Sequence, residues 1–263
     1  MEENKREDCG GMDAARCAEE YGGDVKISTP LIKKIENFWY HYKWHSIAAL
    51  FLVIAILVCS LQMCARVEVD FHLLYAGGTE ISRRSEGGDI PVYNQLTGAV
   101  GAYVSDVDGD GKKNVSLTTY FALSPDEIKE IEATDGVEVN YQLLASDAEA
   151  MRTRFSVGEY YLCLVSPYVY GQYRGSEDSP LFTSLAAYVP EGVEVEYYSD
   201  SAIKLSSTKF WQDNPIVREA LPENTLLVLR TKGAAGGVLG NAKENEKNFN
   251  RAADALRAML GGE

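Results

Sequence analysis

The sequence has 263 residues and a formal charge of −14, from 39 acidic and 25 basic residues. Of these, 9 acidic and 7 basic residues precede Arg66, which leaves 30 and 18 for the rest and a net charge of −12 there. Such an acidic surface repels the phosphates of nucleic acid, so nucleic acid is not an expected partner, whereas cation binding is compatible with it.

The first predicted element is a helix that enters a long apolar segment. Thr29 followed by Pro30 is typical of an N-cap and a first helical position. Residues 46–65, SIAALFLVIAILVCSLQMCA, carry no charge, and about 20 such residues cross the roughly 30 Å hydrocarbon core of a bilayer. The length of chain before this segment argues against a cleaved signal peptide. We therefore expect a disordered cytosolic tail over 1–28 and a juxtamembrane and transmembrane helix over 29–65.

The residues flanking the apolar segment predict its orientation. Trp and Tyr side chains concentrate in FWYHYKWH, residues 38–45, as they do where a helix crosses the membrane–water interface. Lysines cluster on the amino-terminal side, whereas Arg66 stands alone on the other side until Arg83. The positive-inside rule then places the amino terminus in the cytosol and residues 66–263 outside the cell membrane, as a single-pass protein.

Strand patterns follow the apolar segment. In VEVDFHLLY, residues 67–75, apolar residues alternate with Glu68, Asp70 and His72, which predicts a strand with one buried face. Three later runs are more continuously apolar and predict central strands covered on both faces: residues 115–123, 160–166 and 225–231. Cys163 lies in the second of these runs, where a small buried hydrophobic side chain is expected.

Helix signals lie between the strand patterns. Ser124-Pro125-Asp126-Glu127 is a capping box, and the residues 146–149, SDAE, have the same pattern and predict a second helix start. One helical stripe predicts a terminal amphipathic helix: Phe249, Ala252, Ala253, Leu256, Met259 and Leu260. Strands that alternate with helices favour one α/β domain over 66–263, with a largely parallel or mixed sheet flanked by helices.

Several stretches together resemble a family. FWYHYKWH, the DxDGDG loop, RFSVGEYYLCLVSPYVY (154–170) and LPENTLLVLRT (221–231) look like a poorly characterised group of bacterial single-pass membrane proteins. The resemblance implies a short cytosolic start and an extracytoplasmic α/β domain similar to one lobe of solute-binding proteins. It implies an architecture more than an activity.

The segment DVDGDGKKN, residues 106–114, has the spacing of a calcium loop. It resembles the loops of EF-hands and dockerin modules, in which alternate oxygen ligands converge on one ion. The resemblance gives the ligand set Asp106, Asp108, Asp110, the Lys112 carbonyl and Asn114. Leu117 stands where such loops carry a bidentate carboxylate, so affinity must be weak unless a carboxylate arrives from elsewhere. A polar, glycine-rich turn into the next strand is the alternative interpretation.

No catalytic motif accompanies these patterns. The sequence lacks a GxSxG elbow, an HExxH motif and a P-loop, so we do not expect an enzyme. The run GAAGGVLGN, 233–241, could hold an anion before a helix or be a surface loop.

Two functions remain open. The first is a membrane-anchored extracytoplasmic binding module that calcium could stabilise, with its ligand at the carboxyl ends of the strands. The candidate contacts for that ligand are Tyr75, Ser166, Tyr168 and Thr231. The second is a structural or interaction subunit of an envelope assembly that binds no small molecule. In both cases the bilayer is a partner, through residues 46–65.

Overall fold

The computed structural model describes residues 30–64, 69–81, 90–134, 136, 138–157, 160–176, 179–232 and 242–262. The expected tail over 1–28 and the run 233–241 therefore lie outside the described residues. Contacts divide the chain into two compact units, Met1–Arg66 and Val67–Glu263. Each unit is described by itself.

The first unit contains one long helix, α2 (Pro30–Cys64), which begins at the expected proline. Within it, residues Tyr42–Leu61 have a mean hydropathy of 2.3, and none of this stretch is buried. Large apolar side chains such as Leu50 and Phe51 are exposed all around the helix. By length and composition, α2 is able to cross a membrane.

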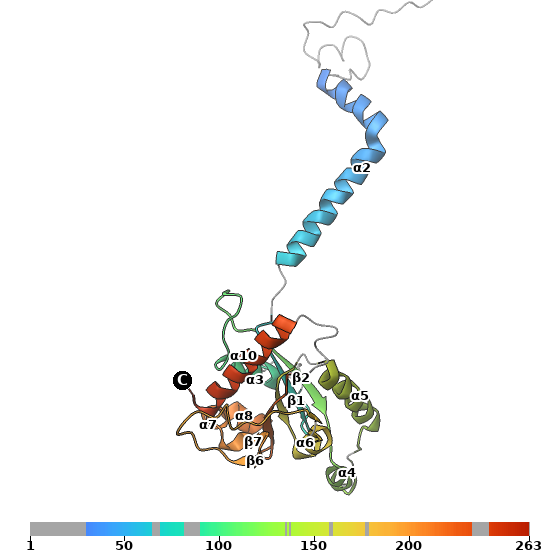
Figure 1. Ribbon diagram of the computed structural model, residues 1–263. Coiled ribbons are helices and arrows are strands. Elements are labelled where there is room, and N and C mark those ends of the chain that lie inside the picture. The colour runs from blue at the N-terminus through green and yellow to red at the C-terminus, as the bar shows by residue number, and fades with distance from the viewer. Residues whose placement is uncertain are drawn as a thin grey trace, which may run out of the picture. The chain divides into compact units, whose positions relative to one another are not determined.

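The second unit (Figure 1) is built on a six-stranded mixed sheet. The strand order in this sheet is β2-β1-β3-β8-β7-β6. Its strands are β1 (Phe71–Gly77), β2 (Val115–Phe121), β3 (Leu162–Val165), β6 (Tyr197–Ser199), β7 (Ala202–Lys204) and β8 (Leu226–Leu229). Strand β1 pairs in parallel with β2 and with β3, whereas β8, β7 and β6 add in antiparallel pairs. A two-stranded ribbon, β4 (Gly175–Ser176) and β5 (Ser179–Pro180), lies outside this sheet.

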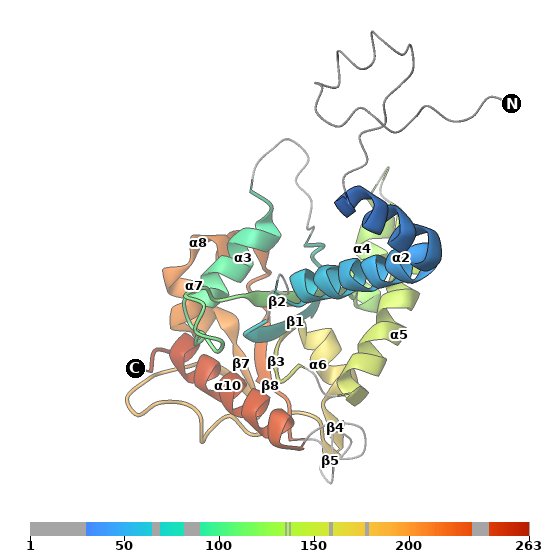
Figure 2. The same ribbon diagram turned by 90° about the horizontal axis from the view of Figure 1, so that it is seen from above.

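Helices cover both faces of the sheet, as the alternating pattern predicts (Figure 2). On one face a large core joins Leu73, Leu162 and Leu227 to four helices: α3 (Val92–Gly101), α7 (Lys209–Asp213), α8 (Pro215–Ala220) and α10 (Ala242–Leu260). On the other face a second core joins Leu74, Cys163 and Val228 to α5 (Tyr141–Val157) and α6 (Pro167–Tyr173). The mixed α/β architecture with a mixed sheet is thus confirmed.

Two strand predictions are corrected. Strand β1 does not alternate, because it is flanked by strands and covered by helices on both faces, and Leu73 to Gly77 are all buried. Asp70, expected on the polar face, is only 4% exposed. Strand β2 was expected to be central, but it is an edge strand, so most of its residues are half-buried. Strands β3 and β8 are fully buried, as predicted.

One of the two predicted capping boxes is present. In α4 (Pro125–Glu132), Ser124 Oγ accepts from the Glu127 N–H and Glu127 Oε2 accepts from the Ser124 N–H. The second prediction is wrong, because α5 begins earlier, at Tyr141. Ser146 is inside the helix and donates to the Leu143 carbonyl. At the actual start of the helix, the Leu143 N–H donates to the side-chain oxygen of Asn140.

The terminal helix α10 has its predicted stripe against the large core, with Phe249, Leu256 and Met259 all buried. Cys163 is completely buried in the second core, as expected. Burial raises the pKa of its thiol to about 12, which makes it a packing residue rather than a nucleophile.

Candidate cation site at the amino ends of β1 and β2

The aspartate loop, residues 106–114, connects α3 to β2. The register of β1 against β2 determines which residues lie next to this loop. Phe71 in β1 is paired with Val115 in β2. Because the two strands are parallel, their amino ends lie at the same edge of the sheet. Asp70, immediately before β1, is therefore adjacent to the loop that immediately precedes β2.

Asp70 is a buried carboxylate held by backbone groups of the loop. Its Oδ1 accepts from the Val107 N–H at 2.9 Å, and its Oδ2 accepts from the Asn114 N–H at 2.7 Å. A buried carboxylate needs such donors to offset lost hydration. Asp70 thereby fixes both ends of the loop relative to β1.

The loop folds around its own aspartates. Asp106 accepts from the Gly109 N–H at 2.7 Å and from the Gly111 N–H at 2.9 Å. Gly109 and Gly111 have φ values of 75° and 81°, which disfavour residues with a Cβ. Asp108 accepts from the Asp110 N–H at 3.0 Å, and Asp110 accepts from the Lys112 N–H at 2.7 Å.

Three carboxylates converge in this arrangement. Asp70, Asp106 and Asp108 each place an oxygen within 4.8 Å of the others, a set able to hold a metal ion. Asp110 is not part of this group in the described structure. Asn114 contributes its backbone to the Asp70 contact, and its buried side-chain Nδ2 has no hydrogen-bond partner there.

Backbone and charge contacts move the pKa values of the loop aspartates Asp106 and Asp108 in opposite directions. Hydrogen bonds from the Gly109 and Gly111 N–H groups lower the pKa of Asp106. For Asp108 the Asp110 N–H acts to lower the pKa, but desolvation and the charges of Asp110 and Asp70 outweigh it and raise the pKa. Like charges therefore crowd Asp108, and a bound cation would relieve that repulsion.

The donor set fits a hard cation. Calcium takes roughly six to eight oxygen ligands, and three carboxylates supply a charged part of that shell. Asp70 brings to this group a carboxylate from outside the loop, whereas the loop itself has Leu117 where calcium loops carry one. The sequence does not reveal this role of Asp70, because Asp70 is far from the loop along the chain. Within its own segment Asp70 is one of the charged residues that alternate with apolar ones, and this pattern predicts a side chain that faces solvent.

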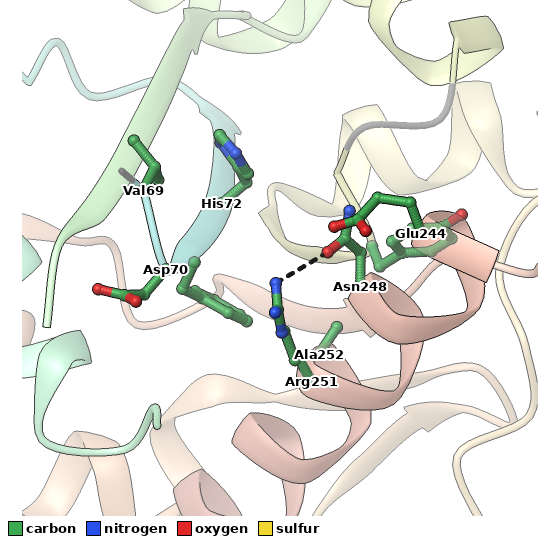
Figure 3. A pocket seen from close by; sticks show the side chains of 9 residues that line it. Val69, Asp70, His72, Glu244, Asn248, Arg251 and Ala252 are labelled. Atoms are coloured by element: carbon green, nitrogen blue, oxygen red, sulfur yellow. Dashed lines mark hydrogen bonds between the residues drawn. The ribbon is translucent and has the colours of Figure 1, made fainter. Parts of the chain in front are cut away.

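Two hollows lie beside this site, against α10. Figure 3 shows the smaller one, about 100 Å³, whose lining includes Asp70 and His72 on one side and Glu244, Asn248 and Arg251 of α10 on the other; the Asp70 carboxylate points away from α10. The larger hollow, about 290 Å³, extends from the segment after α3 to α10. Its lining includes Asp70, Phe71, Tyr103, Ser105, Arg251 and Asp254.

The four candidate ligand contacts do not converge. Tyr75 is buried, and its hydroxyl accepts from the Thr79 N–H at 3.3 Å. Ser166 caps α6 at the carboxyl end of β3, and Tyr168 packs against the second core. Thr231 follows β8, which runs antiparallel to β3, so Thr231 lies at the opposite end of the strands from Ser166. The Thr231 hydroxyl donates to the Pro180 and Leu181 carbonyls.

Comparison with known proteins gives no match: no family model, curated protein or solved structure corresponds significantly to this chain. The structure shows a mixed α/β domain that follows one helix of membrane-spanning length. Its distinguishing feature is the carboxylate group formed by Asp70, Asp106 and Asp108.

Proposed function

We propose that this chain is a membrane-anchored binding module whose α/β domain lies outside the cytoplasm and is stabilised by calcium. The long apolar helix supports the anchor. The lysines before that helix support the orientation. The carboxylate group at the amino ends of β1 and β2 supports the cation.

The observation that carries the proposal is the convergence of Asp70 with Asp106 and Asp108. Asp70 precedes one strand and the other two precede its neighbour, so a cation held by all three would tie β1 to β2. With few protein ligands the affinity is expected to be low. The expected Kd is roughly 10⁻⁴–10⁻³ M, which is the range in which extracellular calcium modules operate. The role of the ion would be structural, because the ion would hold the amino ends of two neighbouring strands together.

Calcium titration of the full chain in nanodiscs tests this proposal. Calorimetry is expected to show saturable heat near millimolar calcium, and the melting temperature should rise over the same range. Asp106→Asn should abolish both effects. Asp126→Asn, an exposed aspartate on α4 that pairs with Lys129, is the matched control and should change neither. Absence of heat and of a melting shift in the wild-type chain would refute calcium binding.

A further inference from the structure

The larger hollow contains a guanidinium that has no carboxylate partner among the described residues. Arg251 lies on α10, and its Nη1 donates to the Asn248 side-chain oxygen at 3.1 Å. Within the described part of the chain, no carboxylate oxygen lies within 4.0 Å of this guanidinium. Its only side-chain partner there is therefore a neutral amide. A half-buried guanidinium in this position has donors left for a second acceptor.

The carboxylates around the same hollow already have partners. Asp70 accepts from two backbone N–H groups. Asp254 accepts from Arg257 at 3.1 Å, on the exposed side of α10. Arg251 is thus the charged lining group with capacity to bind a ligand, and the ligand that suits it is an anion. A carboxylate matches the planar fork of a guanidinium with two parallel hydrogen bonds.

Part of the remaining lining is apolar, beside Tyr103 and Ser105, and the space is small. Phe71, Val104 and Ala255 are buried wall residues, and Ala258 is half-buried beside them. A volume of about 290 Å³ is at the lower limit of pockets that take drug-sized ligands, roughly 300–1,000 Å³. The occupant should therefore combine one anionic group with a short apolar group.

We propose that the larger hollow binds a small carboxylate that carries a short aliphatic group. The carboxylate is held by Arg251, and the aliphatic group lies against Phe71, Val104 and Ala255. This names a ligand class for the binding module proposed above and rests on that function. A calcium ion at Asp70 would also reduce the negative potential at the rim of the hollow, so calcium should strengthen binding.

The test uses 4-methylpentanoate as the probe, titrated into the full chain in nanodiscs with calcium present. Empty nanodiscs correct for partition into lipid. Two probes of similar shape, 4-methylpentan-1-ol and isopentylamine, lack the carboxylate, and acetate lacks the aliphatic group. The expected result is saturable binding of 4-methylpentanoate in the millimolar range, with each comparison probe about tenfold or more weaker.

Variants on α10 locate the site. Arg251→Gln should weaken 4-methylpentanoate about tenfold or more. Lys247→Gln is the matched control, because Lys247 is an exposed cation on the same helix and does not line the hollow, and it should bind like wild type. If Arg251→Gln does not fold, Ala258→Leu replaces it: its larger side chain fills the hollow and should abolish binding.

Three results would overturn the inference: no binding by the folded wild type, equal binding of the alcohol, or unchanged affinity in both Arg251→Gln and Ala258→Leu. The calcium response is measured on the same samples. Calcium binding without carboxylate binding would refute this inference alone, whereas loss of the calcium response would count against the proposed cation site.

Discussion

Asp70 and Asn114, 44 residues apart, bind each other in both directions across the amino ends of β1 and β2. The Asn114 N–H donates to Asp70 Oδ2 at 2.7 Å, and the Asp70 N–H donates to the Asn114 carbonyl at 2.9 Å. The first contact uses a buried side chain and the second extends the backbone ladder of the sheet. The edge strand β2 is therefore fastened at the residue just before its start, independently of any ion.

Asp70→Asn should destabilise the domain even without calcium. The amide offers one acceptor where the carboxylate offers two, so the N–H of Val107 or Asn114 loses its partner. Leaving a buried donor unpaired costs about 1–3 kcal/mol. Urea unfolding in chelator measures the loss, and Asp126→Asn, whose side chain is largely exposed, should stay within about 0.5 kcal/mol of wild type. Equal stabilities of the two variants would show that Asp70 is not needed to hold the loop.

Asp108→Asn should have opposite effects with and without calcium. The pKa of Asp108 is raised, so its charged form is disfavoured in the folded state and removal of the charge should raise the metal-free melting temperature. The same change removes a cation ligand and should reduce the calcium-induced rise. Asp110→Asn is the comparison, because it also relieves repulsion but lies outside the three-carboxylate group. It should keep more of the calcium effect.

The pH dependence of the metal-free domain follows from the same two groups. The lowered pKa of Asp106 contributes stability that is present above its unfolded pKa and is lost as pH falls through the folded value. The raised pKa of Asp108 acts in the other direction, because protonation relieves its repulsion as pH falls. Melting curves of Asp106→Asn against wild type should therefore converge at acidic pH, and a constant difference at all pH values would contradict this assignment.

The sequence predicts elements whose signals are local. Continuous apolar runs at β3 and β8, the Ser124 capping box and the stripe of α10 all depend on residues within a few positions of one another. Helix α3, with its weak pattern VYNQLTGAVG, and the three-residue strands β6 and β7 were not expected. Strands β6 and β7 are too short to show the alternation of apolar and polar residues that identifies a strand. They form because β8 has a free edge with which β7 pairs, and β6 then pairs with β7.

The candidate site shows the same division between local and long-range information. Spacing within DVDGDGKKN identifies Asp106 and Asp108, whose backbone contacts span only a few residues. Asp70 joins them solely because β1 pairs with β2, and pairing of strands is a tertiary event that period-two alternation does not encode. Arg251 is likewise placed by the docking of α10 on the sheet.

Cys163 should resist modification until the domain unfolds. Its thiol is fully buried with a pKa of about 12, so thiolate is scarce at pH 8. In a variant that retains Cys163 and has serine at positions 9, 17, 59 and 64, reaction with a disulfide reagent should follow the opening rate. Urea should accelerate it, and complete labelling within seconds in native buffer would contradict the packing.

The orientation of α2 predicts which cysteines an impermeant maleimide reaches in spheroplasts. Glu130→Cys, at an exposed position of α4, should be labelled in intact spheroplasts because the domain is proposed to lie outside. Native Cys9 and Cys17, which precede the apolar segment, should be labelled only after lysis. The reverse pattern would show that the domain faces the cytosol, where calcium is too scarce for a weak site.

Two glycine-to-alanine changes should have opposite effects on stability. At Gly77 an added Cβ would lie 2.7 Å from the hydroxyl oxygen and 3.0 Å from Cζ of Tyr75. That ring is 1% exposed and has no room to withdraw, so Gly77→Ala should cost about 1–3 kcal/mol. At Gly98, on the exposed face of α3, an added Cβ meets nothing within 4 Å, and alanine should stabilise the helix by about 0.5–1 kcal/mol.

Urea unfolding of both variants beside wild type measures the difference, and each glycine serves as the control for the other. The hydroxyl of Tyr75 also accepts from the Thr79 N–H, so any shift of the ring breaks this bond as well. Tyr75→Phe combined with Gly77→Ala should recover part of the loss, because it removes the atom nearest to the new methyl group. If Gly77→Ala alone is neutral, the backbone at Gly77 or the Tyr75 ring can move enough to accommodate the added methyl group, which would contradict this prediction.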